Sequence, residues 1–366
     1  MQKNDFQHRL LSGLMEDSYQ FHNGRMDVLR FGNGASDGTQ IKQRVSNALG
    51  NLARRRGFAR RHFVIEEAAE KLIRVVGHLD QLEDSYSLLQ DDDSRQLFVD
   101  LLKFRILGAR HVKLPTNNAS YWHNYDSIDE KFPQERHSIS APWGGYVNRY
   151  QLPGLAGSID LHTHPLSVLN TFVHEQYAYR KSGRIIQAEP GDTVIDAGGC
   201  WGDTALYFAD RTGPQGKVYC FEFLPENLEL LRFNIGLNPH LRDTIKVVTK
   251  ALWDRSGEAI GYCANGPGTV LNEAEQSTLQ ASTVSIDDLV QEERVERMDL
   301  IKMDIEGSEL KALQGAEKTI RTFKPKLAIS IYHNIEDFFL IPGYINDLGL
   351  GYEFFLDHFT THHEET

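Results

Sequence analysis

The sequence lacks a long apolar run. None of its hydrophobic stretches approaches the roughly 18 residues that a membrane-spanning helix requires. The first ten residues, MQKNDFQHRL, contain no apolar core of the kind that a signal peptide carries. We therefore expect a soluble, cytoplasmic protein without a membrane partner.

Cysteine is also scarce. The chain has three cysteines, Cys200, Cys220 and Cys263, and no two of them form a CxxC pair. An odd number of widely spaced cysteines argues against a disulfide framework and against a zinc cluster. We expect reduced thiols.

Positive charge is in deficit. Lysine and arginine number 39 against 51 aspartates and glutamates, which gives a formal net charge of -12. Proteins that bind nucleic acid neutralise its phosphates with basic residues, so we expect no nucleic-acid partner. The basic stretch Arg54–Arg61 is an exception, because it could contact a phosphate or an acidic partner, or be a solvated helix face.

The 366 residues are enough for two domains. Apolar residues recur at helical spacing from Ile41 to Gly108, and the run from Asp91 to Ser94 favours a helix start within that region. Residues 113–164 favour a hairpin or an irregular cap, and residues 166–180 return to helical spacing. We expect a mainly helical N-terminal region and cap over residues 1–165 and a second domain over residues 166–366.

Strand and helix patterns alternate in the second domain. Strand patterns occur at 193–197, 217–222, 245–249, 299–304, 326–332 and 352–358, and helical patterns separate them after residues 202, 225 and 307 and near 336–348. Strands that are joined through helices lie parallel in a sheet. The sequence therefore predicts an α/β fold with a Rossmann-like, doubly wound and mostly parallel sheet.

A glycine-rich turn follows the first of these strands. Asp196, Gly198 and Gly202 have the spacing D-x-G-x-x-x-G, and Gly199 lies between the two glycines. A dinucleotide-binding turn has the different spacing G-x-G-x-x-G, which cradles a pyrophosphate. We interpret the turn as a site for S-adenosylmethionine (SAM), with Asp196 near the cationic amine of the methionine portion.

An acidic residue ends the second strand. Glu222 lies 20 residues beyond Gly202, where a carboxylate can hold both ribose hydroxyls of a nucleoside. The next residue, Phe223, is part of the same predicted cofactor site. Gln176 and Tyr177 precede the first strand, where a helix can fold over the cofactor or simply pack against the core.

A third acidic segment follows the strand at 299–304. Lys302, Asp304, Glu306, Gly307 and Glu309 form the run K-x-D-x-E-G-x-E. With FEFLPEN at 221–227, RFNIGLN at 232–238 and SIDDL at 285–289, this run resembles the FkbM family of methyltransferases from about residue 190 to 357. In that family the sheet usually ends with an antiparallel strand after an E-T pair, whereas the pair Glu365–Thr366 ends this sequence and leaves that strand in doubt.

The resemblance implies a class I methyltransferase that transfers a methyl group from SAM to oxygen, commonly to a hydroxyl of a sugar or another small natural product. A base or a metal ion must deal with the hydroxyl proton. Our candidates are Asp304, Glu306 and His333, and His333 could equally be a packed or surface histidine. Asp304 could ligate Mg²⁺, although one carboxylate does not define a metal site.

Two other classes of function stay open. An oxidoreductase that binds NAD or a nucleotide sugar shares the alternating fold and the acid after the second strand, although we find neither its phosphate-cradling turn nor a catalytic tyrosine–lysine pair. The other class is a non-catalytic Rossmann scaffold for the helical region. Cofactor binding would separate these alternatives from a methyltransferase.

Overall fold

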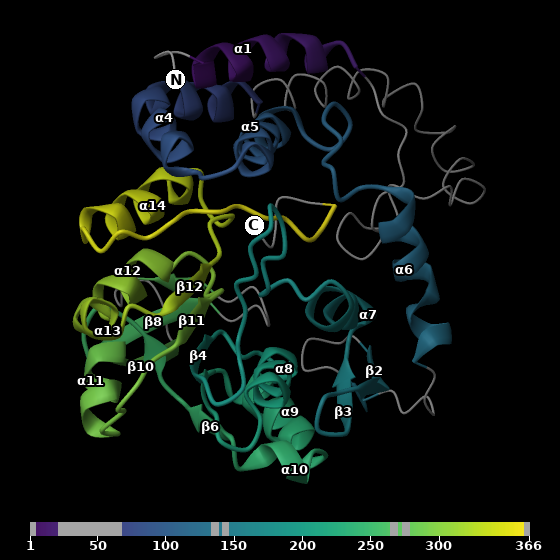
Figure 1. Cartoon of the computed structure of the whole chain (residues 1–366), viewed down its shortest axis with the longest axis vertical. Helices are drawn as coiled ribbons and strands as arrows, with labels where there is room; N and C mark the ends of the chain where they lie inside the picture. The colour runs from purple at the N-terminus through teal and green to yellow at the C-terminus, as the bar shows by residue number, and fades with distance from the viewer. Residues whose placement is uncertain are drawn as a thin grey trace. The chain divides into compact units, whose positions relative to one another are not determined.

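The computed structural model describes residues 5–20, 68–132, 139–140, 146–263, 270–272 and 279–361. Contacts divide the chain into two compact units, Met1–Asn117 with Glu353–Glu364 and Asn118–Tyr352 with the last two residues (Figure 1). We expected a boundary after residue 165, and this division falls after residue 117. The basic stretch Arg54–Arg61 lies outside the described residues. No helix in the described ranges combines the length and the apolar character that a bilayer crossing requires.

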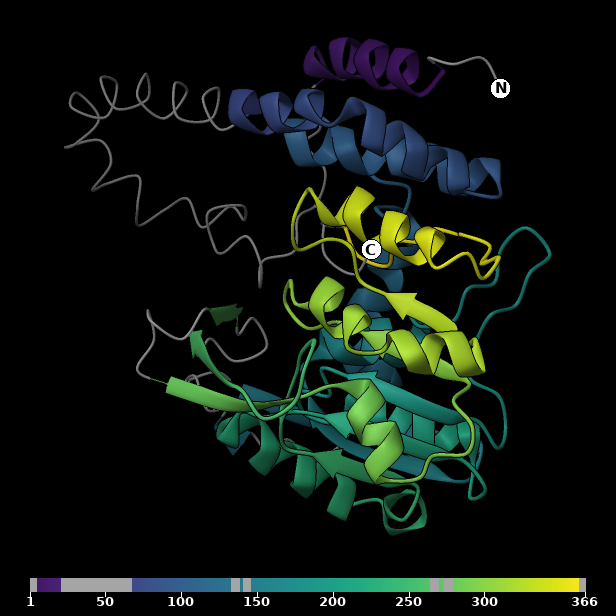
Figure 2. The ribbon, with the colours of Figure 1, turned by 90° about the vertical axis from the view of Figure 1, so that its left-hand side faces the viewer.

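The first unit is helical. α1 (Asp5–Ser18) packs against α4 (Leu79–Leu88) and α5 (Asp92–Leu107), and Figure 2 shows α1 running alongside the blue helices. Residues 68–77 are also helical, whereas residues 41–67 lie outside the described ranges. α5 begins as predicted, because the Asp91 carboxylate accepts a hydrogen bond from the Ser94 backbone amide at 2.7 Å. The helical prediction is confirmed for residues 68–107.

The predicted strand at 352–358 is wrong. Residues 353–361 contain no strand of the main sheet and lie in the first unit. Their backbone pairs there instead, since Gln90 N–H donates to the Phe354 carbonyl at 3.0 Å and Leu356 N–H donates to Ser94 Oγ at 2.9 Å. The aromatic and apolar residues of this segment imitate a strand pattern, but other partners take its hydrogen bonds.

The second unit is built on a five-stranded parallel sheet. The strand order is β12–β11–β4–β5–β6, and every neighbouring pair is parallel. The strands are β4 (Thr193–Ala197), β5 (Lys217–Phe221), β6 (Ile245–Val248), β11 (Leu300–Met303) and β12 (Lys326–Ile329). This sheet confirms the predicted Rossmann-like α/β fold.

The strand order reverses beside β4. The chain moves from β4 through β5 to β6 on one side, and it continues with β11 and β12 on the other side. In Figure 1, α8 (Asp203–Thr212) and α9 (Pro225–Gly236) lie on one side of the sheet, and α12 (Glu309–Gln314) and α13 (Glu317–Phe323) lie on the other. Ligands of open α/β sheets bind beyond the C-terminal strand ends at such a reversal, which here lies between β4 and β11.

A second sheet lies between β6 and β11 in the chain and was not predicted. It has the order β7–β10–β8–β9 and consists of β7 (Ala251–Leu252), β8 (Ala259–Cys263), β9 (Val270–Asn272) and β10 (Leu279–Val284). Further helices of this unit are α6 (Ala119–Lys131), α10 (Pro239–Arg242), α11 (Ile286–Glu292) and α14 (Asp337–Asp347). The predicted helix near 336–348 corresponds to α14.

The predicted hairpin is confirmed. β2 (Tyr146–Pro153) pairs antiparallel with β3 (Ser158–Thr163), and β1 (Ile139–Ser140) pairs with β2. Two asparagines hold β3. Asn234 of α9 exchanges hydrogen bonds with the backbone of His162 at 2.9 and 3.0 Å, and Asn238, just before α10, does the same with Asp160 at 2.8 and 2.7 Å. These amides take the place of a neighbouring strand.

The predicted helix over 166–180 forms only in its first half. α7 (Pro165–Ser167) continues into the π-helical turn η1 (Val168–Val173), and Glu175 adopts a left-handed φ of 51° that ends the helix. Gln176 and Tyr177 therefore lie in an irregular segment. π-helical turns are frequent at functional sites.

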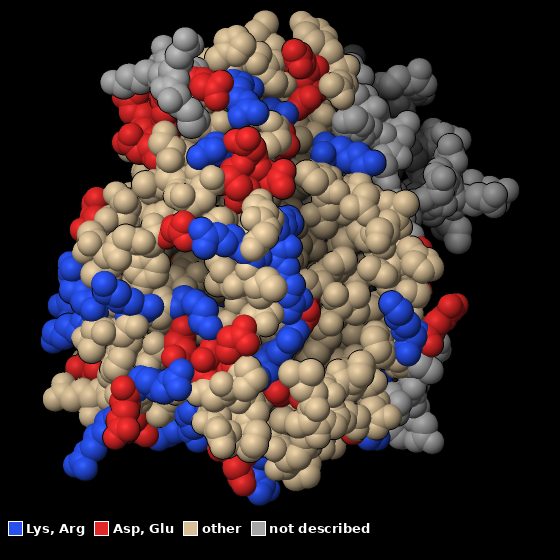
Figure 3. Space-filling view, viewed as in Figure 1, with Lys and Arg blue, Asp and Glu red and all other residues tan. Residues whose placement is uncertain are grey.

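Surface charge is mixed. On the face drawn in Figure 3, basic and acidic side chains lie among a larger area of other residues. Both signs contribute to this face.

Candidate active site

The ends of four adjacent strands bring the predicted site residues to one edge of the sheet. Gly198 follows β4, Glu222 follows β5, Asp304 follows β11, and His333 lies four residues beyond β12. The strand reversal lies at the same edge. The candidate active site is therefore the C-terminal edge of the parallel sheet.

The turn after β4 requires its glycines. Gly198 has a φ of 86°, and a Cβ on it would lie 2.0 Å from the Asp304 carbonyl oxygen. A Cβ on Gly199 would lie 2.1 Å from Cys220 Sγ. Gly202, with a φ of 87°, leads into α8. Because these residues have no Cβ, the turn can lie against the ends of both β11 and β5.

The first backbone amides of this turn have partners inside the protein. Gly198 N–H and Gly199 N–H both donate to the Phe221 carbonyl, at 3.2 and 2.9 Å. A pyrophosphate-binding turn instead presents its amides to the ligand. These two amides are therefore not offered to a phosphate in this arrangement.

Lys302 of β11 ties the glycine turn to the sheet. Its Nζ lies 3.0 Å from Asp196 Oδ1 and donates to the carbonyls of Ala197 and Gly198 at 3.0 and 2.9 Å. The side chains of Lys302 and Asp196 are 1% and 0% exposed. Burial by itself lowers the pKa of Lys302, but Asp196 and Asp304 outweigh it, so the pKa is raised above its ordinary value. Lys302 is a buried cation that fixes the turn.

Asp196 is engaged within the protein. One carboxylate oxygen pairs with Lys302, and the other accepts a hydrogen bond from the Thr204 hydroxyl at 2.8 Å. Asp196 therefore holds Thr204 and the buried cation of Lys302 in place. Its predicted contact with the amine of a ligand stays a prediction.

Asp203, the first residue of α8, is the next acid along the chain. Thr171 of η1 donates its hydroxyl to Asp203 Oδ2 at 3.3 Å. Burial raises the pKa of Asp203 to about 6, although the Lys302 charge opposes this shift. A buried carboxylate without a paired cation gains from the approach of a cationic ligand.

Glu222 lies against the glycine turn. Its Oε1 accepts hydrogen bonds from the backbone amides of Phe223 and Leu224 at 2.7 and 2.8 Å, and its Oε2 accepts one from Asn227 at 3.0 Å. Burial raises the pKa of Glu222, and hydrogen bonds, including one from the Cys200 backbone, oppose that rise. The carboxylate is thus held in one orientation beside the turn.

The other predicted cofactor residues lie at the same edge or close to it. Tyr177 donates its hydroxyl to Asp304 Oδ2 at 3.3 Å, and its ring centroid lies 5.1 Å from Lys302 Nζ. Gln176 Oε1 is buried and has no hydrogen-bond partner among the described residues. The Phe223 ring contacts Tyr262 edge-on, with centroids 5.2 Å apart.

Asp304 is surrounded by donors. Tyr332 donates to its Oδ1 at 2.8 Å, Tyr177 donates to its Oδ2, and His333 Nε2 lies 3.5 Å from Oδ1. Both oxygens of Asp304 therefore have partners. Its side chain is 17% exposed, compared with 27% for Glu306.

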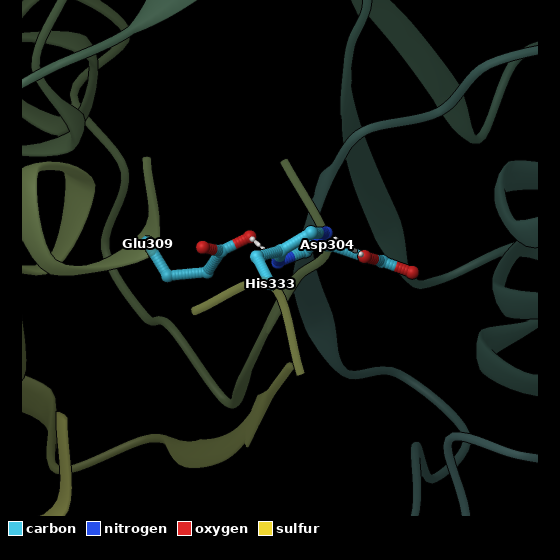
Figure 4. A group of neighbouring side chains, drawn as sticks. All are labelled: Asp304, Glu309 and His333. Atoms are coloured by element: carbon cyan, nitrogen blue, oxygen red, sulfur yellow. Dashed lines mark ion pairs between the residues drawn. The ribbon is translucent and has the colours of Figure 1, made fainter. Parts of the chain in front are cut away.

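His333 lies between carboxylates on both sides of its ring. Nδ1 lies 3.2 Å from Glu309 Oε1, and Nε2 lies 3.4 Å from Glu306 Oε2 as well as near Asp304. Figure 4 shows the imidazole between Glu309 and Asp304. Burial by itself lowers the pKa of His333, but the carboxylates outweigh it and raise the pKa to about 11.

Three of these residues also form a potential metal-binding group. Asp304, Glu309 and His333 offer ligand atoms within 4.8 Å of one another. However, only two of the three ligand atoms are oxygens. Mg²⁺ prefers an octahedral shell of oxygen ligands. This arrangement does not fit the magnesium site that we considered from the sequence.

Four residues of the site were given no role from the sequence. The sequence does indicate a structural role for Lys302, because a lysine within an apolar strand pattern needs a partner for its charge when it is buried. Glu309 belongs to the run K-x-D-x-E-G-x-E, and Asp203 and Tyr332 only lie near the motifs. Their contacts depend on residues from other strands and helices.

Comparisons with known proteins agree with this geometry. Residues 186–354 match the family described as Methyltransferase FkbM domain. A curated relative, the 2-O-methyltransferase NoeI of Sinorhizobium fredii, is 25% identical over 151 residues, which cover 36% of this chain and 60% of that protein.

A solved structure shares the fold. The methyltransferase FkbM from Methylobacillus flagellatus KT superposes with a TM-score of 0.50 at 21% identity, covering 80% of this chain and 58% of that chain. The chain thus spans about 60% of the length of the curated relative and 58% of the solved one. Over residues 186–354 the chain is therefore similar to the methyltransferase domain of the FkbM family.

Proposed function

We propose that this domain transfers a methyl group from SAM to a hydroxyl oxygen of an uncharged small molecule such as a sugar. The observation that carries the proposal is the position of Glu222, held beside the glycine turn at the edge where the strand order reverses. There its carboxylate can receive the ribose hydroxyls of the cofactor. Phe223 and Tyr177 would line the same cofactor site.

The methionine end of SAM carries an ammonium group. Asp203 is a better partner for it than Asp196, because Asp196 is already paired with Lys302. Gln176 Oε1 and Asn170 Oδ1 are buried acceptors without a donor in the described part of the chain. Both residues belong to the segment that contacts Asp203 through Thr171.

The NAD alternative has less support. The turn after β4 uses the amides of Gly198 and Gly199 within the protein, whereas a dinucleotide site needs such amides for the pyrophosphate. Methyl transfer requires no phosphate contact. The geometry of the turn thus favours SAM over NAD.

The reaction is an in-line displacement. The hydroxyl oxygen forms a bond to the methyl carbon as the bond from carbon to the sulfonium sulfur breaks, and the hydroxyl proton must leave. Asp304, Glu306 and His333 are the groups at hand, and Glu306 is the most exposed of them. No side chain in the described ranges bonds to its Oε1, so we assign the proton to Glu306.

The net charge of the site indicates which class of methyl acceptor it can bind. Asp304, Glu306 and Glu309 surround a single histidine, so this end of the site is negative overall. Negative charge stabilises a sulfonium donor and repels an anionic acceptor. The name of the NoeI relative, a 2-O-methyltransferase, also supports oxygen as the methylated atom.

Turnover on a panel of acceptors tests the proposal. We expect mass spectrometry to detect methylated product from neutral methyl glycosides with SAM, and none from the matching methyl uronides. Glu306→Gln should slow turnover by roughly 100-fold or more, while Glu296→Gln, at an exposed glutamate, leaves it unchanged. Methylation of uronides alone, or full activity of Glu306→Gln, would overturn the acceptor and base assignments.

A further inference from the structure

Carboxylates lie close to both ring nitrogens of His333. Each nitrogen is 3.2 to 3.5 Å from at least one carboxylate oxygen. These are ion-pair distances, because neither nitrogen forms an aligned hydrogen bond among the described residues. Three carboxylates at such distances favour the positively charged ring, in which both nitrogens carry protons.

Glu309 has the most enclosed carboxylate of this group. Its side chain is 0% exposed, and its Oε1 accepts the Ile305 backbone amide at 2.7 Å while it faces His333 Nδ1. Its Oε2 is buried without a hydrogen-bond partner in the described part of the chain. A buried carboxylate needs a nearby cation, and His333 is the cation that contacts it.

We propose that Glu309 is a positioning residue that keeps His333 as an imidazolium and holds its Nε2 close to Asp304 and Glu306. The proposal rests on the proposed function, because it assigns this pair to the acceptor end of the same site. The sequence motif K-x-D-x-E-G-x-E contains Glu309, but the structure alone gives it this task.

In this arrangement His333 supplies a positive charge, and a different residue accepts the proton of the acceptor hydroxyl. His333 already holds a proton on each nitrogen, so it cannot take the hydroxyl proton of the acceptor. Its positive charge instead lies between the carboxyl groups of Asp304 and Glu306 and the buried one of Glu309. The remaining oxygen of Glu306 then receives the proton.

The acidic residues near the His333 ring come from several elements. Asp304 comes from the end of β11, Glu306 from the turn that follows, Glu309 from α12 and Asp337 from α14. Asp337 bonds to Asn334 rather than to the ring, at 2.8 Å from its backbone amide and 3.1 Å from its side chain. Asp337 therefore serves as a matched control, a buried acid near His333 that does not contact it.

Titration of the histidine ring tests the proposal without an acceptor. The full chain is labelled with ¹⁵N-histidine, and the His333 signal is assigned by its loss in His333→Gln. We expect the wild-type ring to stay an imidazolium through pH 9, and Glu309→Gln to lower its midpoint by at least one pH unit. Asp337→Asn should shift it by less than half as much.

Binding of S-adenosylhomocysteine is measured in the same variants to separate this proposal from the proposed function. A wild-type ring that titrates near neutral pH, or equal shifts in Glu309→Gln and Asp337→Asn, would overturn the positioning role even if the cofactor product binds. Loss of binding in the wild type would overturn the proposed function, whatever the ring does.

Discussion

Replacing Lys302 by methionine tests the buried ion pair that anchors the glycine turn. Lys302→Met keeps the length and apolar stem of the side chain but removes its Nζ, which pairs with Asp196 and donates to the Ala197 and Gly198 carbonyls. Asp196 would then be a buried carboxylate without its cation. Breaking a buried pair on one side costs about 3 to 5 kcal/mol.

The expected result is a large fall in stability. For a domain of this size each kcal/mol corresponds to about 2 to 4 °C, so the melting temperature of the second unit should fall by roughly 10 °C. Differential scanning calorimetry measures it. Lys311→Met is the matched control, because Lys311 pairs with Asp254 at 3.1 Å while 48% exposed, and such surface pairs contribute about 0 to 1 kcal/mol.

A double-mutant cycle isolates the pair. Adding Asp196→Asn to Lys302→Met removes the unpaired charge, so the double variant should be more stable than Lys302→Met alone. If Lys302→Met melts within 2 °C of Lys311→Met, the buried pair does not anchor the turn and the reasoning fails.

Three further predictions concern Gly198, Asp203 and His333. Gly198→Ala should abolish binding of S-adenosylhomocysteine in calorimetry, because its Cβ would meet the Asp304 carbonyl. Gly257→Ala is the control, since Gly257 has a similar φ of 82° but open space around it, and this variant should bind normally. Equal binding by both variants would contradict the close approach of Gly198 to Asp304. The affinity of the wild type for S-adenosylhomocysteine should fall as the pH drops through about 6, because protonation of Asp203 removes the negative charge that pairs with the ammonium group of the ligand. Asp203→Asn should bind weakly at every pH in this range. The free energy of unfolding in urea should decrease as the pH rises from 6.5 to about 11, because His333 in the folded protein holds a proton that the unfolded histidine releases. If the unfolding free energy of His333→Gln falls with pH as steeply as that of the wild type, this explanation is wrong.

The main sheet could be predicted because its signals are local. Each parallel strand is a short apolar run, and the residues that end β4, β5 and β11 are a glycine turn or an acid. Strand ends of one parallel sheet meet at one edge. The sequence alone therefore predicts that Glu222 and Asp304 lie at one edge of the sheet, where the structure has them.

Other features depend on distant partners. The pairing of Asp196 could not be predicted, because its partner, Lys302, lies on a neighbouring strand more than a hundred residues later in the chain. The second sheet contains strands as short as β7, with two residues, which carry no periodic pattern. The segment after Tyr352 has strand-like residues, yet its backbone pairs with Gln90 and Ser94.

Calorimetry with S-adenosylhomocysteine tests the central claim most directly. The wild type should bind it and should give no heat with NAD⁺. Glu222→Gln, which keeps the size of the side chain, should weaken binding by roughly 1 to 3 kcal/mol, and Glu226→Gln, four residues on and exposed, should bind like the wild type. Equal affinity for NAD⁺, or unchanged binding by Glu222→Gln, would contradict the account.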